Sequence, residues 1–523
     1  MARRWKFWGW GYEGEGLTAE EERSLLRLYA AQLDMAPGER PAPPKVGDIA
    51  LRPPRVEAPR ALAGICTSEP YERLLHSYGQ SYPEAVRIFA RDFENAPDLV
   101  ARPRSDAEVL AAFEWADHAG VAVIPFGGGS SVVGGVEPAV GAGFDATISL
   151  DLKGLDKVLE IDRTSRAARI QGGILGPALE AALKPHGLTL RHFPQSFEFS
   201  TLGGWIATRS GGHFATLYNH IDDLVESLRM VTPSGVLETR RLPGSGAGPS
   251  PDRLLIGSEG ALGVITEAWM RLQERPTFKA TVAIGFRDFQ AGARAVRAIG
   301  QAGLYPSNLR LLDPLESEIN GAGDGSEALL VLGFESADHP VDPWLARALE
   351  LVRDHGGRAH QDTRAAEAWR TAFIRMPYLR EIQVPAGIIA DTFESAITWD
   401  RFEAFHDQVK TATAGAIEEA TGRPGLVSCR FTHVYPDGPA PYFTFHARGR
   451  EGALIEQWRH VKQAASDAVI EGGGTITHHH AVGRDHMPWY QRQRPALFGE
   501  ALAAAKRALD PAGIMNPGVL VPT

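Results

Sequence analysis

The sequence predicts an α+β protein with two sheets, and three observations support this fold class. An apolar strand at 121–125 runs straight into three glycines, Gly127, Gly128 and Gly129. Short strands and a hairpin follow as far as residue 239, and after Pro276 strands alternate with helices in a different rhythm. A chain of 523 residues is long enough for two or three domains, so we expect each sheet to have its own core.

The first half begins with a segment that is helix-like and then proline-rich, from about residue 17 to 59, which is typical of an arm laid over a body. Ser105-Asp-Ala-Glu108 has the spacing of a capping box and predicts a helix behind it, before the strand at 121–125. The elements expected next are strands at 147–152, 157–161 and 167–171, a helix at 177–184, and a hairpin at 228–239 that turns at Pro233-Ser-Gly235.

The second half predicts another sheet, with helices on one of its sides. Its expected strands are 280–286, 308–312 and 328–334, and its expected helices are 289–301 and 343–355. The last segment, from about Gly472, carries three adjacent histidines and a helix at 495–509.

Composition and missing motifs exclude several function classes. A net charge of −10 argues against a nucleic-acid partner, because a phosphate backbone requires a basic face. Cys66 and Cys429 are too few for a disulfide framework or a CxxC metal site, and no signal peptide or membrane span is recognisable, so we expect a cytoplasmic protein. The chain has no Gly-Lys dipeptide and therefore no P-loop, and it has no Gly-x-Ser-x-Gly and no His-Glu-x-x-His. Kinase, hydrolase and zincin functions lose most of their support. Gly141 to Ala146 fits a loose dinucleotide fingerprint but runs into a strand.

The glycine loop after the first strand is suited to holding a phosphate. Glycines let the backbone turn through positive φ and bring successive N–H groups to an anion, and Ser130 and Ser131 add donors. Taken alone, the loop is equally typical of a tight turn.

Three further segments, 195–201, 208–212 and 257–266, also combine hydroxyls, glycines and exposed backbone, which indicates one long ligand held at many points. That description suits FAD. The cofactor-binding residues we expect are Pro125, Phe126, Gly127, Gly128, Gly129, Ser130, Ser131, Gln195, Ser196, Phe197, Glu198, Phe199, Ser200, Thr201, Thr208, Arg209, Ser210, Gly211, Glu259, Gly260, Ala261, Leu262, Gly263, Val264 and Ile265.

These segments resemble the FAD domain of the vanillyl-alcohol oxidase flavoprotein family and, within it, the alkyldihydroxyacetonephosphate synthases. The resemblance covers nearly the whole chain, and so many runs in the family's order make chance similarity very improbable. The runs that carry it are Trp5 to Tyr12, Phe197 to Trp205, Gly257 to Thr266, Thr392 to Ser395, Trp399 to Arg401, Thr432 to Tyr435, and His478 to His480 with Val482-Gly483.

The resemblance implies a domain plan and an activity. The plan is an N-terminal helical arm (1–95), an FAD-binding domain (96–276), an α/β substrate or cap domain (277–470) and a C-terminal segment that completes the active site and the FAD domain (471–523). The implied activity replaces the acyl group of acyl-dihydroxyacetone phosphate by a long-chain fatty alcohol, in ether lipid synthesis without net redox. No histidine follows the first glycine loop as in covalently flavinylated relatives, so FAD is expected to bind noncovalently. A lipid-like substrate, peripheral contact with a membrane and a homodimer are also expected.

The resemblance also places the reactive residues. Tyr442 matches the family's catalytic tyrosine, although its alternation with Phe443 and Phe445 alone would favour an ordinary half-buried strand. His478, His479 and His480 suit proton transfer or phosphate binding. They follow an apparent strand end at 474–477, and on a strand only His478 and His480 would share a face.

The alternatives for the histidines are a metal site or a solvated cluster. No metal is expected there, because a metal site would need ligands that converge tetrahedrally. Arg380 and Arg310 match arginines of the family's active-site region, where a guanidinium fork can grip a phosphate, although either is equally typical of a surface ion pair.

Two departures from the family leave the substrate open. Ala481 stands where the family usually has glycine, and Gln195-Ser-Phe197 replaces Asp-Ser-Leu. The main alternative is an FAD-dependent 2-hydroxyacid dehydrogenase or oxidase, which shares Asn516-Pro-Gly518 but carries Gly-Glu-His-Gly-x-Gly where this chain has residues 478–483. The missing glutamate counts against it. A third class is a flavoprotein that binds FAD without turnover.

Overall fold

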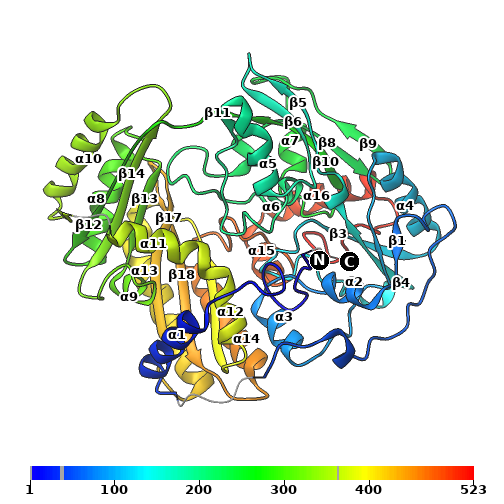
Figure 1. Ribbon diagram of the computed structural model, residues 1–523, viewed down its shortest axis with the longest axis horizontal. Helices are drawn as coiled ribbons and strands as arrows, with labels where there is room; N and C mark the ends of the chain where they lie inside the picture. The colour runs from blue at the N-terminus through cyan, green and yellow to red at the C-terminus, as the bar shows by residue number, and fades with distance from the viewer. Residues whose placement is uncertain (1–2, 36–40, 362–363, 523) are drawn as a thin grey trace.

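The computed structural model describes residues 3–35, 41–361 and 364–522, and its α+β class confirms the prediction. Figure 1 shows two bodies beside each other, one built on a four-stranded and a five-stranded sheet and the other on a seven-stranded sheet. Residues 36–40, in the proline-rich part of the predicted arm, lie outside the described residues.

The four-stranded sheet carries the glycine loop. Its order is β1 (Cys66–Thr67), β2 (Leu99–Ala101), β4 (Ala146–Asp151), β3 (Val121–Phe126), with β2, β4 and β3 parallel. The helix α4 (Asp106–His118) precedes β3, and the Ser105 hydroxyl accepts the Glu108 N–H at 3.3 Å. The predicted capping box is half formed, because the Glu108 carboxylate accepts from Arg104 N instead of Ser105 N.

The five-stranded sheet is antiparallel and supports the other cofactor segments. Its order is β5 (Val158–Asp162), β6 (Ala167–Gln171), β10 (Val264–Arg271), β8 (Val225–Thr232) and β9 (Gly235–Glu238). The predicted hairpin is formed by β8 and β9, where Thr232 pairs with Gly235 across the turn. The helices α5 (Gly176–Leu183), α6 (Leu202–Thr208) and α7 (Pro251–Leu255) belong to this body.

The seven-stranded antiparallel sheet forms the second body. Its order is β15 (Arg358–Ala359), β12 (Phe278–Phe286), β14 (Ala328–Ser336), β13 (Asn308–Leu312), β17 (Leu426–Val434), β18 (Pro439–Arg448) and β16 (Ile388–Glu394). The long helices α8 (Phe289–Gln301), α10 (Asp342–Asp354), α13 (Trp399–Thr421) and α14 (Leu454–Glu471) share one core with it. Shorter helices, α9 (Pro314–Ile319), α11 (Arg364–Arg375) and α12 (Arg380–Gln383), complete this body.

In β13, in β18 and in β17 as far as Thr432, side-chain alternation divides the residues by number. Odd-numbered residues such as Leu311, Phe443 and Phe445 are buried in the core shared with the long helices. Even-numbered residues such as Arg310 and Tyr442 line a cavity on the opposite face. This division follows from the two-residue repeat of a strand.

The remaining elements lie around the two bodies. The helix α1 (Ala19–Gln32) belongs to the arm, and the Tyr29 hydroxyl hydrogen-bonds to His446 Nε2 at 3.1 Å. No described helix is long and apolar enough to cross a membrane. The other elements are α2 (Pro70–Leu75), α3 (Tyr82–Phe89), β7 (Leu188–Thr189), β11 (Gln273–Glu274), α15 (Met487–Gln493) and α16 (Ala496–Leu509).

Candidate active site

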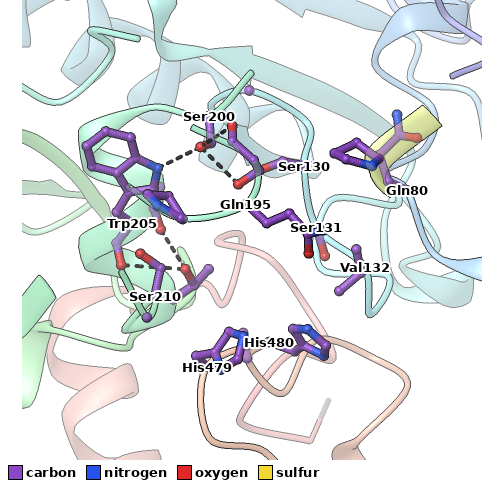
Figure 2. A pocket seen from close by; sticks show the side chains of 18 of the residues that line it. Gln80, Ser130, Ser131, Val132, Gln195, Ser200, Trp205, Ser210, His479 and His480 are labelled. Atoms are coloured by element: carbon purple, nitrogen blue, oxygen red, sulfur yellow. Dashed lines mark hydrogen bonds between the residues drawn. The ribbon is translucent and has the colours of Figure 1, made fainter. Parts of the chain in front are cut away.

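A cavity of about 330 Å³ brings together residues of both bodies. The glycine loop and the serine-containing segments line it from the first body, and residues of β13, β16, β17, β18 and the helices α11 and α12 line it from the second. Figure 2 shows His479 and His480 across the pocket from Ser130 and Ser131. The site is concave and draws polar groups from several segments, which is typical of a cofactor pocket.

The glycines of the first loop are required by close packing. A Cβ on Gly128 would lie 1.8 Å from the Phe199 carbonyl oxygen, and one on Gly127 would lie 2.3 Å from Thr201 Oγ1. Gly129 has φ of +69°, in the left-handed region that favours glycine. The loop therefore packs directly against the segment at 195–201, and this packing leaves no room for side chains at Gly127 and Gly128.

Most of the predicted cofactor-binding residues line this cavity. Those that do are Pro125, Phe126, Gly127, Gly128, Gly129, Ser130, Ser131, Gln195, Ser196, Ser200, Thr201, Thr208, Ser210, Gly211, Glu259, Gly260, Gly263, Val264 and Ile265. Hydrogen bonds hold the serine segment in place: Ser200 Oγ donates to the Ser196 carbonyl at 2.8 Å and accepts from Trp205 Nε1 at 2.6 Å (Figure 2).

Six predicted cofactor-binding residues do not line the cavity. Phe197 stacks on Trp205, Phe199 packs among the aromatic residues of the arm, and Arg209 pairs with Asp222 at 3.1 Å. The other three are Glu198, which is exposed, and Ala261 and Leu262, which are buried in the core. A sequence run cannot separate residues that face a ligand from residues that hold the run in place.

Glu259 ties the cofactor body to the C-terminal segment. Its buried carboxylate accepts the Val482 N–H at 2.8 Å and the Gly483 N–H at 2.7 Å. Burial raises the pKa of Glu259 to about 7, although these two hydrogen bonds oppose the shift. Asn516 donates to the Glu259 carbonyl at 2.8 Å, so two parts of the C-terminal segment meet at this residue.

Tyr442 is a buried phenol on β18, only 5 % exposed, and it lines the cavity. The Arg430 guanidinium lies 3.8 Å from the centre of its ring. Burial raises the pKa of Tyr442, and the charge of Arg430 partly offsets this. The hydroxyl is therefore protonated at neutral pH and able to donate a hydrogen bond or a proton.

The three histidines lie on an irregular loop, which differs from the apparent strand end expected from the sequence. His479 and His480 line the cavity, and their rings lie 6.0 Å and 5.3 Å from the Tyr442 ring, centre to centre. His478 is not part of the cavity wall. Its Nε2 lies 2.7 Å from the Tyr435 hydroxyl and 3.1 Å from His220 Nε2.

The Glu394 carboxylate sets the shape of this loop. It accepts the backbone N–H groups of all three histidines, at 2.6 Å from His478, 3.0 Å from His479 and 2.8 Å from His480. Burial alone would raise the pKa of Glu394, but its interactions with the histidines outweigh burial and lower the pKa well below its usual range. Burial lowers the pKa of His479 to about 3 and also lowers that of His480, so both rings are neutral at pH 7.

Both predicted phosphate-binding arginines line the cavity. Arg310 on β13 is 2 % exposed, forms no ion pair with a described carboxylate, and lies 5.0 Å from the Phe373 ring. Burial, assisted by the charge of Arg430, lowers the pKa of Arg310 to about 9, so it remains a cation at neutral pH. Arg380 instead donates to Asp391 at 3.1 Å and to the Gln80 carbonyl at 2.9 Å.

Several cavity residues were not predicted from the sequence. Arg430 and its ion-pair partner Glu316 lie beside Tyr442, and His433 lies beside the histidines. Glu394, which holds the histidine loop without lining the cavity, was not predicted either. The strand alternation that places Tyr442 and Arg310 on one face also places Arg430 and Thr432 there. That signal was available once β17 was recognised as a strand.

Comparison with known proteins supports the same reading. Residues 97–240 match the model of the FAD binding domain, and residues 275–520 match that of the C-terminal domain of FAD linked oxidases. Alkyldihydroxyacetonephosphate synthase of Dictyostelium discoideum is 31% identical over 477 residues, covering 86% of this chain and 77% of that protein. The enzyme of the same name from Trypanosoma brucei brucei is 28% identical and covers 99% of this chain and 92% of its own.

Solved structures agree. An alkyldihydroxyacetonephosphate synthase structure superposes with a TM-score of 0.81 at 27% identity, covering 98% of each chain. A p-cresol methylhydroxylase structure, 14% identical with a TM-score of 0.69 over 97% of this chain and 98% of its own, shares the fold.

The residues present fit FAD, because the glycine cradle, packed closely against the Phe199 carbonyl, and the serine segments line one cavity. FAD is the cofactor that the matched domains bind. The chain belongs to the alkyldihydroxyacetonephosphate synthase family.

Proposed function

We propose that this protein exchanges the acyl group of acyl-dihydroxyacetone phosphate for a long-chain fatty alcohol, releasing a fatty acid and forming an ether without net redox. One observation carries the proposal: the Tyr442 phenol and the imidazoles of His479 and His480 line the same cavity as the glycine cradle. Bound FAD supplies the electron-rich ring on which the exchange depends. The remaining tasks, which are proton transfer, phosphate binding and water exclusion, fall to side chains of this chain.

His479 and His480 are suited to take the acidic proton beside the substrate ketone. Their rings are neutral at pH 7, so each has a lone pair available as a general base. Glu394 lies 3.5 Å from His479 Nδ1 and 3.8 Å from His480 Nδ1, and its negative charge favours the imidazolium formed once the proton is taken. Tyr442, which remains protonated, is placed to donate to the departing carboxylate.

Arg310 is the proposed anchor for the substrate phosphate. A buried guanidinium without a carboxylate partner is unfavourable unless an anion joins it. A phosphate accepts two parallel N–H bonds from such a fork. Arg380 already pairs with Asp391, and its second role is to add positive potential on the same cavity wall.

We also propose the division of the chain into an arm (1–95), an FAD-binding domain (96–276), a cap domain (277–470) and a completing C-terminal segment (471–523). The separate cores of the two bodies support it. Peripheral contact with a membrane, supported by Leu497 and Phe498, whose exposed fractions are 77% and 51%, and assembly as a homodimer belong to the same proposal.

The test is an anaerobic assay with acyl-dihydroxyacetone phosphate and hexadecanol. We expect formation of the alkyl ether and release of the fatty acid without any electron acceptor. A 2-hydroxyacid dehydrogenase would instead bleach its flavin with D-lactate or a similar acid and catalyse no exchange. Bleaching without exchange would overturn the proposal, and neither reaction would point to a protein that binds FAD without turnover.

A further inference from the structure

The triple histidine is joined by a fourth buried imidazole that is remote in the sequence. One ring nitrogen from each of His433, His478 and His479 lies within 4.8 Å of the others. His433 lies on β17, so its ring approaches the site from a different element than the two histidines of the loop. The sequence argument against a metal, that the histidines cannot converge, therefore does not hold for this set.

The hydrogen bonds of His433 leave one ring nitrogen with an available lone pair. Its Nε2 lies 3.0 Å from the Gly212 carbonyl, which accepts only from a protonated nitrogen. Its Nδ1 therefore has no proton, and it is buried with no hydrogen-bond partner among the residues that the structure describes. A histidine whose second nitrogen donates to a backbone carbonyl is the usual arrangement of a metal ligand.

The other two rings bring nitrogens to a separation that suits a metal. His478 and His479 have their Nδ1 atoms 3.3 Å apart, close to the separation of about 3.4 Å between two nitrogens bound tetrahedrally to zinc at about 2.0–2.1 Å. Tyr435 and His220 contact the Nε2 of His478 and orient its ring. The Glu394 carboxylate, 3.5 Å from His479 Nδ1, supplies negative charge beside the site.

We propose that His433, His478 and His479 form a binding site for a borderline divalent transition metal such as Zn²⁺, and that its occupancy inhibits the enzyme. A metal held there fixes His479, whose ring is stacked beside Tyr442, and removes its lone pair from proton transfer. The proposed metal binding does not depend on the proposed exchange reaction, whereas the proposed inhibition does.

The test is a zinc titration of the chelator-treated, FAD-loaded protein, in competition with a chromophoric chelator. We expect about one Zn²⁺ per chain, with at least about tenfold weaker binding by His433→Gln and by His478→Gln. The control is His460→Gln, which changes an exposed histidine paired with Glu419 and should bind zinc like the wild type.

Flavin absorbance and circular dichroism establish that each variant is folded. If His433→Gln loses its flavin, His478→Gln decides, because His478 does not line the flavin cavity. Zinc binding that is unchanged in the folded variants, or no zinc uptake by the wild type, would overturn the proposal. In the exchange assay we expect zinc to inhibit and a chelator to restore the rate. Zinc binding without inhibition would contradict the inhibitory role, and the proposed binding site would still stand.

Discussion

Glu394 and Tyr442 are directly paired in the antiparallel ladder between β16 and β18. The carboxylate that accepts the three histidine N–H groups is therefore fixed in register with the phenol. Backbone hydrogen bonds between two strands determine this register, so the distance from the histidine loop to the tyrosine does not depend on the loop's own flexibility.

Tyr442→Phe should abolish exchange and leave the flavin spectrum unchanged. The substitution removes only a hydroxyl from a buried ring, so packing is preserved while the proton donor is lost. We expect a loss of about 10²- to 10⁴-fold in kcat, measured in the anaerobic assay. Tyr305→Phe, at a 53% exposed site, is the matched control. Normal turnover by Tyr442→Phe would remove the phenol from the mechanism.

Gly128→Ala should prevent FAD binding. The added Cβ would lie 1.8 Å from the Phe199 carbonyl oxygen, and neither backbone can move without disturbing the cradle. Flavin content of the purified protein is the measurement. Gly143→Ala is the control, because a Cβ there meets nothing within 4 Å and its φ is not positive. A fully loaded Gly128→Ala variant would contradict the placement of the phosphate loop.

Arg310→Met should weaken binding of the phosphorylated substrate more than it slows the chemical step. Methionine retains the volume that packs near Phe373 but removes the buried cation. We expect KM to rise by about 30-fold or more, because truncating a buried charge partner costs about 2–5 kcal/mol. The comparison is Arg287→Met, whose side chain is 88% exposed. An unchanged KM would assign the phosphate to other residues.

Ala481→Gly should stabilise the protein. Ala481 has φ of +75°, a conformation that costs an L-residue about 1–2 kcal/mol and costs glycine little. We expect the free energy of unfolding to rise by about 1 kcal/mol in chemical denaturation. Ala504→Gly, on an exposed position of α16, should lower it by about the same amount. Destabilisation by both glycines would show that Ala481 makes contacts that outweigh its strain.

Glu259→Gln should change how stability depends on pH. The folded-state pKa of Glu259 is about 7, above its unfolded value of about 4.5, so the native state retains the proton longer. Its contribution is fully present below pH 4.5 and is lost as the pH rises to about 7, by up to about 3 kcal/mol. The variant does not titrate there, so its stability relative to the wild type should increase over this range. Glu114→Gln, at an exposed site on α4, should show no such trend in thermal unfolding.

Local patterns predicted the regular elements well. The helix at 289–301 and the strand at 308–312 have the predicted bounds, because each shows a clear repeat and the helix begins after Asp288, whose carboxylate caps it. The shape of the histidine loop was not predictable. It depends on Glu394, which lies 84 residues before His478 and contacts it only in the folded chain. Likewise, Glu198 and Phe199 belong to a run typical of a cofactor site, yet tertiary packing directs their side chains away from the cavity.

The alternation of core and cavity residues along β13 and β18 has a consequence for how the family diversifies. Substitutions at odd positions such as Phe443 change the core and therefore affect the stability of the fold. Substitutions at even positions such as Thr444 change the cavity wall and therefore affect which substrate is accepted. Members of the family can therefore change their substrate through single substitutions on the cavity face of these strands, while the core on the opposite face keeps the protein stable.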